Sequence, residues 1–151
     1  MAKAKSKKGA SRGKAAASEP ESEERVEALL GELGRGFPIA MMALDGGRIG
    51  IGSLALGVGL AANAYAANYA TERQQFGRPI SKFQAIQWMI ADNATELDAA
   101  RLLVLRAAWL KEQKQPFSRE ASMAKLWASE KAFTACNRSL QVLGGYGYTQ
   151  E

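Results

Sequence analysis

The chain has 151 residues, 47% of them hydrophobic, with one cysteine (Cys136) and no histidine. A chain of this length and hydrophobic content can form one globular domain with a core, and the single cysteine excludes an intramolecular disulfide. The single cysteine and the lack of a signal-peptide pattern together indicate a reducing compartment. Without histidine or a Cys/His cluster, the usual neutral-pH acid–base catalyst and the common ligand sets for zinc, iron–sulfur and haem are absent, so we expect no metal site.

The net charge of +5 belongs to the N-terminus. Residues 1–14 hold six basic side chains and no acid, which leaves −1 on the rest of the chain. Residues 1–25 have too few large apolar side chains to offset the entropy of ordering, so we predict a disordered charged tail. Two other interpretations are an arm for an anionic surface and a mitochondrial transit peptide. No aromatic side chain interleaves the lysines, so we expect no nucleic-acid partner.

The first predicted helix covers residues 38–70. An apolar row at helical spacing, predicted to face the core, comprises Ile51, Leu54, Val58, Ala62, Tyr65 and Tyr69. A second row of small side chains, suited to close helix approach, comprises Gly50, Ser53, Gly57, Ala61 and Ala64. No charge lies between Arg48 and Glu72, a stretch long enough to span a membrane. Because it is rich in Ala and Gly and contains Asn63 and Asn68, we predict a buried bundle helix and no membrane span.

Two further helices are predicted after a link at residues 71–79, which contains Gly77 and Pro79. Ser81 and Gln84 have the spacing of a capping box for a helix that extends to residue 112. Its predicted core row comprises Phe83, Ile86, Ile90, Ala94, Leu97, Val104 and Ala108. Ser118 is the predicted cap of the third helix, which ends at Gly144 and Gly145. The predicted apolar face of that helix comprises Met123, Leu126, Phe133 and Leu140.

Short links between long helices indicate antiparallel neighbours, so we expect an all-α, up-and-down bundle. Three helices of this kind leave a groove that a fourth helix would fill. No internal repeat and no phosphate-binding glycine pattern after a strand is present.

Four segments carry residues that could bind a ligand. The first segment consists of Asp45, Gly46, Gly47 and Arg48. It is either a helix turn weakened by glycine, with a local ion pair, or an exposed backbone that a ligand can approach, where Arg48 pairs with an acidic group of that ligand. The second covers residues 72–79 and contains Arg73, Gln75 and Phe76. It is either a polar loop or a site for a phosphate and a ring. The third is Gln84, with the capping role as its other interpretation. The fourth covers residues 141–148, and its candidate cofactor-binding residues are Gln141, Val142, Leu143, Gly144 and Gly145. Its glycines are either an ordinary helix cap or exposed amides for a pyrophosphate.

Taken together in their order and spacing, these segments resemble the acyl-CoA dehydrogenase family. The similar blocks read GFPIAMMALDGGRIGIGSLALG, YATERQQFGRPISKFQAIQWMIADNATELDAARLLVLRAAWL, PFSREASMAKLWASEKA and QVLGGYGYTQE. LLGELGRGF before them resembles the family's exit from its middle β domain. The resemblance covers residues 26–151, which are identified as an incomplete C-terminal helical domain.

The resemblance implies a reaction and a cofactor. Members are FAD flavoproteins that oxidise an acyl-CoA thioester to the trans-2-enoyl-CoA. In them a glutamate removes the α-proton while the flavin takes the β-hydride. They form homo-oligomers in which each flavin site is shared, and electron-transfer flavoprotein is the expected electron acceptor.

The same resemblance assigns roles to the ligand segments. Asp45, Gly46, Gly47 and Arg48 match the turn that contacts acyl-CoA. Arg73, Gln75, Phe76 and Gln84 match positions at the FAD of a neighbouring subunit. Residues 141–145 match the segment that meets the ADP part of that FAD.

The chain also departs from the family pattern. Residues 1–25 do not resemble the two N-terminal domains, and Glu151 precedes the segment that supplies the catalytic glutamate. We therefore expect no catalytic residue, no last bundle helices and no activity of this chain by itself. The alternative is a non-catalytic helical association module that retains the subunit interface. The expected location is the cytoplasm of a bacterium or the mitochondrial matrix of a eukaryote.

Overall fold

The computed structural model describes residues 30–149, and the predicted tail at residues 1–25 and Glu151 lie outside them. The chain divides into two units, with the boundary between residues 36 and 37. The described part of the first unit is a turn, in which the Arg35 N–H donates to the Glu32 carbonyl oxygen. The ligand segments all lie in the second unit.

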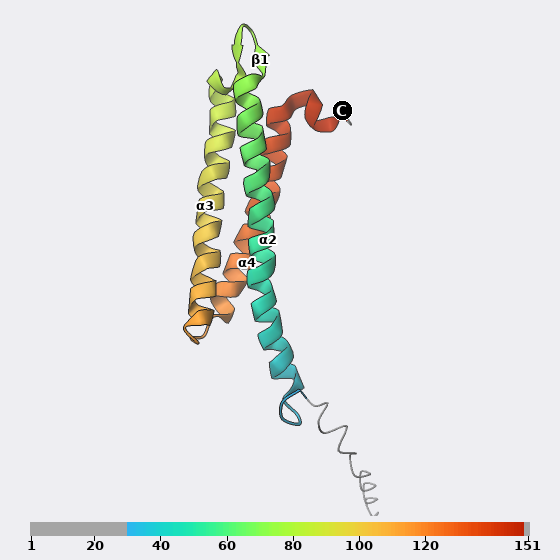
Figure 1. Ribbon diagram of the computed structural model, residues 1–151, viewed down its shortest axis with the longest axis vertical. Coiled ribbons are helices and arrows are strands. Elements are labelled where there is room, and N and C mark those ends of the chain that lie inside the picture. Colours follow the sequence, from blue (N-terminus) through green and yellow to red (C-terminus); the bar gives the residue numbers. More distant parts are fainter. Residues whose placement is uncertain (1–29, 150–151) are drawn as a thin grey trace, which may run out of the picture. The chain divides into compact units, whose positions relative to one another are not determined.

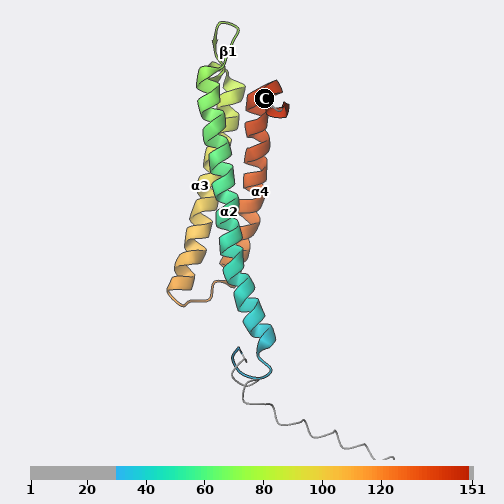
Figure 2. The same ribbon diagram turned by 45° about the vertical axis from the view of Figure 1, so that its right-hand side comes forward.

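The second unit is an up-and-down arrangement of long helices, as predicted (Figure 1). Its described elements are α2 (Gly36–Glu72), β1 (Gln74–Gln75), β2 (Arg78–Pro79), the 3-10 helix η1 (Ile80–Lys82), α3 (Gln84–Glu112), α4 (Ser118–Leu143) and the 3-10 helix η2 (Gly144–Tyr148). Viewed from a second side, α2 and α4 run in the same direction and α3 runs in the opposite direction (Figure 2). The ends of α2 and α4, the hairpin and η2 therefore lie at one end of the bundle.

The two short strands form an antiparallel hairpin that we did not predict. Gln74 pairs with Pro79 and Gln75 with Arg78, which leaves Phe76 and Gly77 as the turn. Strands of two residues are too short to show an alternating pattern.

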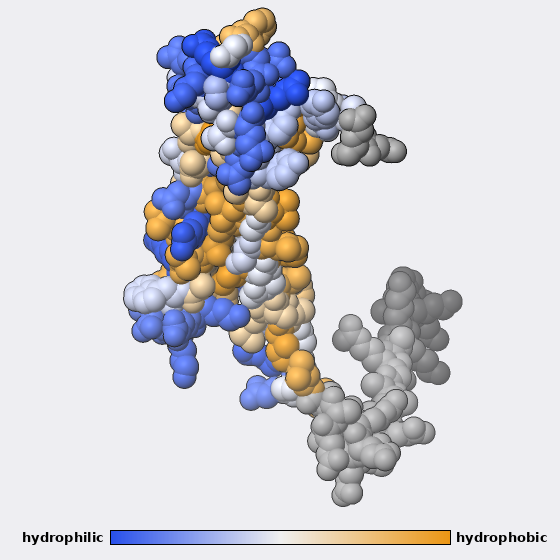
Figure 3. All heavy atoms as spheres, turned by 45° about the horizontal axis from the view of Figure 1, so that its top comes forward, coloured by the Kyte–Doolittle hydropathy of each residue, from blue (hydrophilic) through white to orange (hydrophobic). Residues whose placement is uncertain are grey.

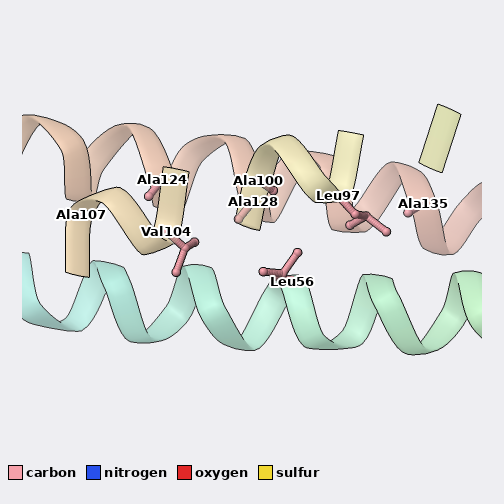
Figure 4. Close-up of a cluster of buried hydrophobic side chains, with 8 residues drawn as sticks. All are labelled: Leu56, Leu97, Ala100, Val104, Ala107, Ala124, Ala128 and Ala135. Carbon is pink, nitrogen blue, oxygen red and sulfur yellow. The ribbon is translucent and has the colours of Figure 1, made fainter. Parts of the chain in front are cut away.

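The helices pack mainly through small side chains. The main buried cluster comprises Leu56 of α2, Leu97, Ala100, Val104 and Ala107 of α3, and Ala124, Ala128 and Ala135 of α4 (Figure 4). Alanine at the contact lets helix axes approach closely, and interaxial distance follows the size of the contact residues. A second cluster, Ala66, Ala70, Ile80 and Val142, lies toward the hairpin end and is joined by partly buried Phe83, Ile86 and Ile90.

The predicted core face of α2 was wrong. Its buried residues are Gly52, Leu56, Gly59, Ala66 and Ala70, whereas Ile51, Leu54, Val58 and Tyr65 of the predicted apolar row are at least half exposed. The small row (Gly50, Ser53, Gly57, Ala61 and Ala64) is exposed too. Because α2 is apolar on nearly every side, its composition does not distinguish one face from another.

The predicted face of α4 was also wrong, and for a related reason. Met123, Leu126, Phe133 and Leu140 are all exposed. The buried row consists of Ala121, Ala124, Ala128, Ala132, Ala135, Ser139 and Val142. On α3 the prediction was better: Leu97 and Val104 are buried, although Ala94 is exposed.

Both predicted N-terminal caps were wrong. Phe83 is the N-cap of α3 and Phe117 that of α4, and neither helix has a side-chain cap hydrogen bond. Ser81 lies in η1, where its carbonyl oxygen accepts a hydrogen bond from Gln87 Nε2 at 2.9 Å. The predicted glycine end of α4 is confirmed, because Gly144 follows Leu143 with a φ of +61°.

Among the described residues, α2 is the one helix long and apolar enough to cross a membrane, by length and composition alone. One face of it packs on α3 and α4, with Leu56 in the shared cluster. The absence of a membrane span stays a prediction.

Candidate functional site

A cavity of about 680 Å³ lies at the hairpin end of the bundle. Its lining comes from the end of α2 (Tyr69, Arg73), the hairpin and η1 (Gln75, Phe76, Ile80), the start of α3 (Phe83, Ala85, Ile86), and the end of α4 with η2 (Val142, Leu143, Gly144, Gly145, Tyr146, Thr149). Ligand pockets typically measure roughly 300–1,000 Å³, so this cavity has the size of a small-molecule site.

The cavity brings together two ligand segments that are far apart in the sequence. Arg73, Gln75 and Phe76 lie on one side and Val142–Gly145 on the other. Gln84 and Gln141 are exposed and do not line it. The assignment of these residues to a cofactor stays a prediction.

Arg73 supplies positive charge to the cavity. Its backbone is fixed at both ends, because its N–H donates to the Tyr69 carbonyl oxygen at 2.9 Å and its carbonyl oxygen accepts from the Ile80 N–H at 2.8 Å. Its guanidinium lies over the Tyr146 ring, with Cζ 5.2 Å from the ring centroid. Within residues 30–149 no carboxylate forms an ion pair with it. The charge is therefore available to an anionic ligand.

The hairpin turn presents an aromatic side chain in a costly conformation. Phe76 has a φ of +52° and Gly77 of +78°, the signs required by the type I′ turn of a two-residue hairpin loop. Such turns favour Asn or Gly first, and a left-handed conformation costs a bulky residue roughly 1–2 kcal/mol. Phe76 is nevertheless 92% exposed, with its ring edge-on to Phe83 at 6.2 Å between centroids. A strained backbone at a residue whose side chain is hardly buried is typical of a functional position.

Arg78 forms a second cation–aromatic pair at this end. Its Cζ lies 4.3 Å from the centroid of the Phe83 ring. Arg78 and Tyr146 lie within the second and fourth predicted ligand segments, whereas Phe83 was predicted only as a core residue. The signal that could have indicated Phe83 is the alternation of arginines and aromatic residues that begins at Arg73.

The other predicted ligand segment lies near the opposite end of α2. Residues 45–48 are helical, and the Arg48 guanidinium forms an ion pair with Asp45 and donates to Ser122 Oγ at 3.2 Å. A Cβ added at Gly46 would lie 3.1 Å from Lys111 Nζ, so a second cation stands beside the segment. At 1.5 Å per residue, Asp45 and Arg73 are separated by roughly 40 Å along the helix. One copy of the chain therefore cannot place both segments on one small reacting group.

A polar network crosses the middle of the bundle. Asn93, 1% exposed, donates to Asn63 Oδ1 at 3.1 Å and to the Ala135 carbonyl oxygen at 3.3 Å. Glu96 accepts hydrogen bonds from Lys131 at 2.8 Å and from Arg138 at 3.0 Å. The Lys131 hydrogen bond, with the positive charges of Arg138 and Lys131, lowers the pKa of Glu96 against the opposing effect of burial. Because these groups satisfy one another, the network is best explained as a link between helices.

Comparison with known proteins places the chain in a family. The family model for the C-terminal domain of acyl-CoA dehydrogenases matches residues 34–151. The chain belongs to the acyl-CoA dehydrogenase family.

Individual members of the acyl-CoA dehydrogenase family agree with this assignment. The mitochondrial short-chain specific acyl-CoA dehydrogenase of Bos taurus is 54% identical over 83% of this chain and 30% of its own length. Butyryl-CoA dehydrogenase from Megasphaera elsdenii is 48% identical, with a TM-score of 0.77 over 79% of this chain and 31% of that one. A third similar chain comes from a structure of the electron transferring flavoprotein of Acidaminococcus fermentans, concerned with flavin-based electron bifurcation. That chain is 54% identical, with a TM-score of 0.80, and the match covers 82% of this chain and 32% of that one. The chain spans about a third of the length of these relatives.

Proposed function

We propose that the chain is the C-terminal helical part of an FAD-dependent acyl-CoA dehydrogenase, and that the cavity at its hairpin end binds the ADP part of FAD. The parent reaction is the α,β-dehydrogenation of an acyl-CoA to the trans-2-enoyl-CoA. The observation that carries the proposal is the convergence of Arg73, Gln75 and Phe76 with Val142–Gly145 around one cavity.

The chemistry of the lining fits an adenine dinucleotide. A guanidinium without an acidic partner suits a diphosphate, which accepts charge-assisted hydrogen bonds. The Phe76 and Phe83 rings offer faces and edges to a purine. Gly144 and Gly145 have no side chain to keep a phosphate from their backbone, and a Cβ added at either would meet nothing within 4 Å. When bound, the flavin would supply the hydride-accepting chemistry.

We propose that this chain by itself does not catalyse. No cavity-lining residue in the described part of the chain carries a carboxylate or an imidazole, so the cavity has no general base for the α-proton. Dye-linked turnover of butyryl-CoA by the purified chain with added FAD would contradict this.

The distance between the two ligand segments supports a shared site in the parent enzyme. Asp45–Arg48 would contact acyl-CoA at one end of α2, while Arg73 would contact FAD at the other. A site that needs both segments near one flavin draws them from two copies of the chain, so a homo-oligomer follows. The electron acceptor would be an electron-transfer flavoprotein, and the location the bacterial cytoplasm or the mitochondrial matrix.

A second candidate function is a non-catalytic association module. It is favoured by the exposed apolar side chains of α2 and α4, including Leu54, Tyr65, Leu126 and Phe133. Figure 3 shows apolar surface gathered along the middle of the bundle between more polar ends. Apolar patches of this kind are typical of interfaces. An oligomer that binds neither FAD nor ADP would favour this function over the first.

The test is calorimetric titration of the full chain with ADP, comparing Arg73→Ala with Gln84→Ala. Arg73→Ala removes a charge-assisted contact worth roughly 1.5–3 kcal/mol, so the affinity should fall more than tenfold. Gln84 is exposed outside the cavity lining, so Gln84→Ala should leave the affinity within about twofold of wild type. Absence of ADP binding by the wild-type chain, or equal losses for both variants, would overturn the proposal.

A further inference from the structure

We infer that Tyr146 is a positioning residue that holds the Arg73 guanidinium at the cavity for the diphosphate of a bound nucleotide; this inference rests on the proposed function. The Arg73 side chain is long and flexible, and fixing it in the absence of ligand reduces the entropy lost on binding. The described residues offer it no carboxylate partner. The Tyr146 ring, 5.2 Å from Cζ, is the group in place to fix it.

The two partners come from different parts of the bundle. Arg73 follows the last residue of α2, and its backbone is pinned to Tyr69 and Ile80. Tyr146 lies in η2, directly after α4. The cation–π contact therefore joins the hairpin side of the cavity to its α4 side.

The position of the Tyr146 ring is itself fixed by close packing of the backbone. A Cβ added at Gly147 would lie 2.6 Å from the Leu140 carbonyl oxygen, so η2 folds tightly against the last turn of α4. Gly144, with a φ of +61°, allows the chain to turn there. The glycines on both sides thus place the ring, and the ring in turn places the guanidinium.

The exposure of the ring also favours a role beyond packing. Tyr146 is 53% exposed and belongs to neither buried cluster. Its contribution to the core is therefore small. Arg78 has an independent aromatic partner in Phe83, 4.3 Å away, so loss of Tyr146 leaves that pair intact.

The test compares three variants of the full chain by titration with ADP and with adenosine. Tyr146→Leu removes the ring and should lower ADP affinity roughly two- to fivefold, the range expected for a partly exposed cation–π contact. Adenosine has no diphosphate, so its affinity should not change. Tyr146→Phe keeps the ring and should bind both as wild type does. Tyr148→Leu is the matched control, because Tyr148 lies in the same 3-10 helix, is 76% exposed and does not line the cavity.

The outcomes separate the inference from the function on which it rests. Three results would each overturn the positioning role alone. They are an unchanged ADP affinity in Tyr146→Leu, equal losses of affinity for ADP and adenosine in that variant, and a Tyr146→Phe variant that binds ADP as weakly as Tyr146→Leu. A wild-type chain that binds no ADP would overturn both the proposed function and this inference. Selective loss for ADP in Tyr146→Leu, with Tyr148→Leu unaffected, would establish the role.

Discussion

Gly59 is the position at which the packing of α2 can be tested most sharply. A Cβ added there would lie 2.7 Å from Leu97 Cδ2 and 3.1 Å from the Ala132 Cα. Leu97 is itself fully buried, and the Cα of Ala132 cannot move unless α4 moves. At Gly57, two residues away on the same helix, an added Cβ meets nothing within 4 Å. Gly57→Ala is therefore a matched control for Gly59→Ala.

Two effects set the size of the difference. Replacing glycine by alanine in a helix interior favours folding by about 1 kcal/mol at either position. Inserting a methyl group into a filled contact typically costs about 1–3 kcal/mol, and this cost applies only at Gly59. The propensity gain cancels in the comparison, so Gly59→Ala should be less stable than Gly57→Ala by about 1–3 kcal/mol.

Thermal unfolding followed by circular dichroism measures this difference. For a domain of this size, a change of 1 kcal/mol shifts the melting temperature by roughly 2–8 °C. Gly57→Ala should melt above wild type, whereas Gly59→Ala should melt below Gly57→Ala by at least that shift. Equal increases for the two variants would show that α2 does not lie against Leu97 and Ala132.

Three further predictions concern the polar network and the hairpin. Asn93→Ala leaves buried partners unsatisfied and should lower the free energy of unfolding by about 1–3 kcal/mol in urea titrations; an unchanged value would show that its contacts with Asn63 and Ala135 do not stabilise the fold. Because the folded-state pKa of Glu96 lies below the ordinary 4.5, its contribution to stability is present above that pH and is lost as the pH falls through the folded pKa. Glu96→Gln should therefore melt below wild type near neutral pH and approach it under acidic conditions, and a gap that widens on acidification would contradict the sign of this shift. Phe76→Asn relieves a left-handed aromatic residue and should raise the melting temperature while weakening ADP binding; a parallel fall in both would show that the Phe76 ring is structural.

The sequence predicted the three helices more accurately than the faces that they bury. Gly144 marks the end of α4 with local chemistry, so the predicted boundary fell close to the observed one. The buried face of α2 could not be chosen, because leucine, alanine and glycine occur on every side of it. On α4 the core row is alanine, and large side chains such as Phe133 point away from the helices of this unit. A rule that buries the largest apolar residues therefore selects the wrong face.

The candidate site was predicted in part. The resemblance indicated Arg73 and Gly144 as ligand residues, and the structure places both on one cavity. Gln84 was predicted as a ligand residue from its position in the sequence, but at its place in α3 it does not line the cavity. Tyr146 lies within the fourth predicted segment, but its contact with Arg73 could not be predicted, because Arg73 lies 73 residues away and only the fold brings the two together.

The central claim is that the hairpin-end cavity binds the ADP part of a flavin nucleotide, and nuclear magnetic resonance tests it most directly. A ¹⁵N-labelled sample of the full chain would be titrated with ADP while backbone amide shifts are followed. We expect saturable shift changes at Arg73–Phe76 and Val142–Tyr146, with none at Asp45–Arg48 on the far end of α2. Changes centred on Asp45–Arg48, or no saturable change at the cavity, would contradict it.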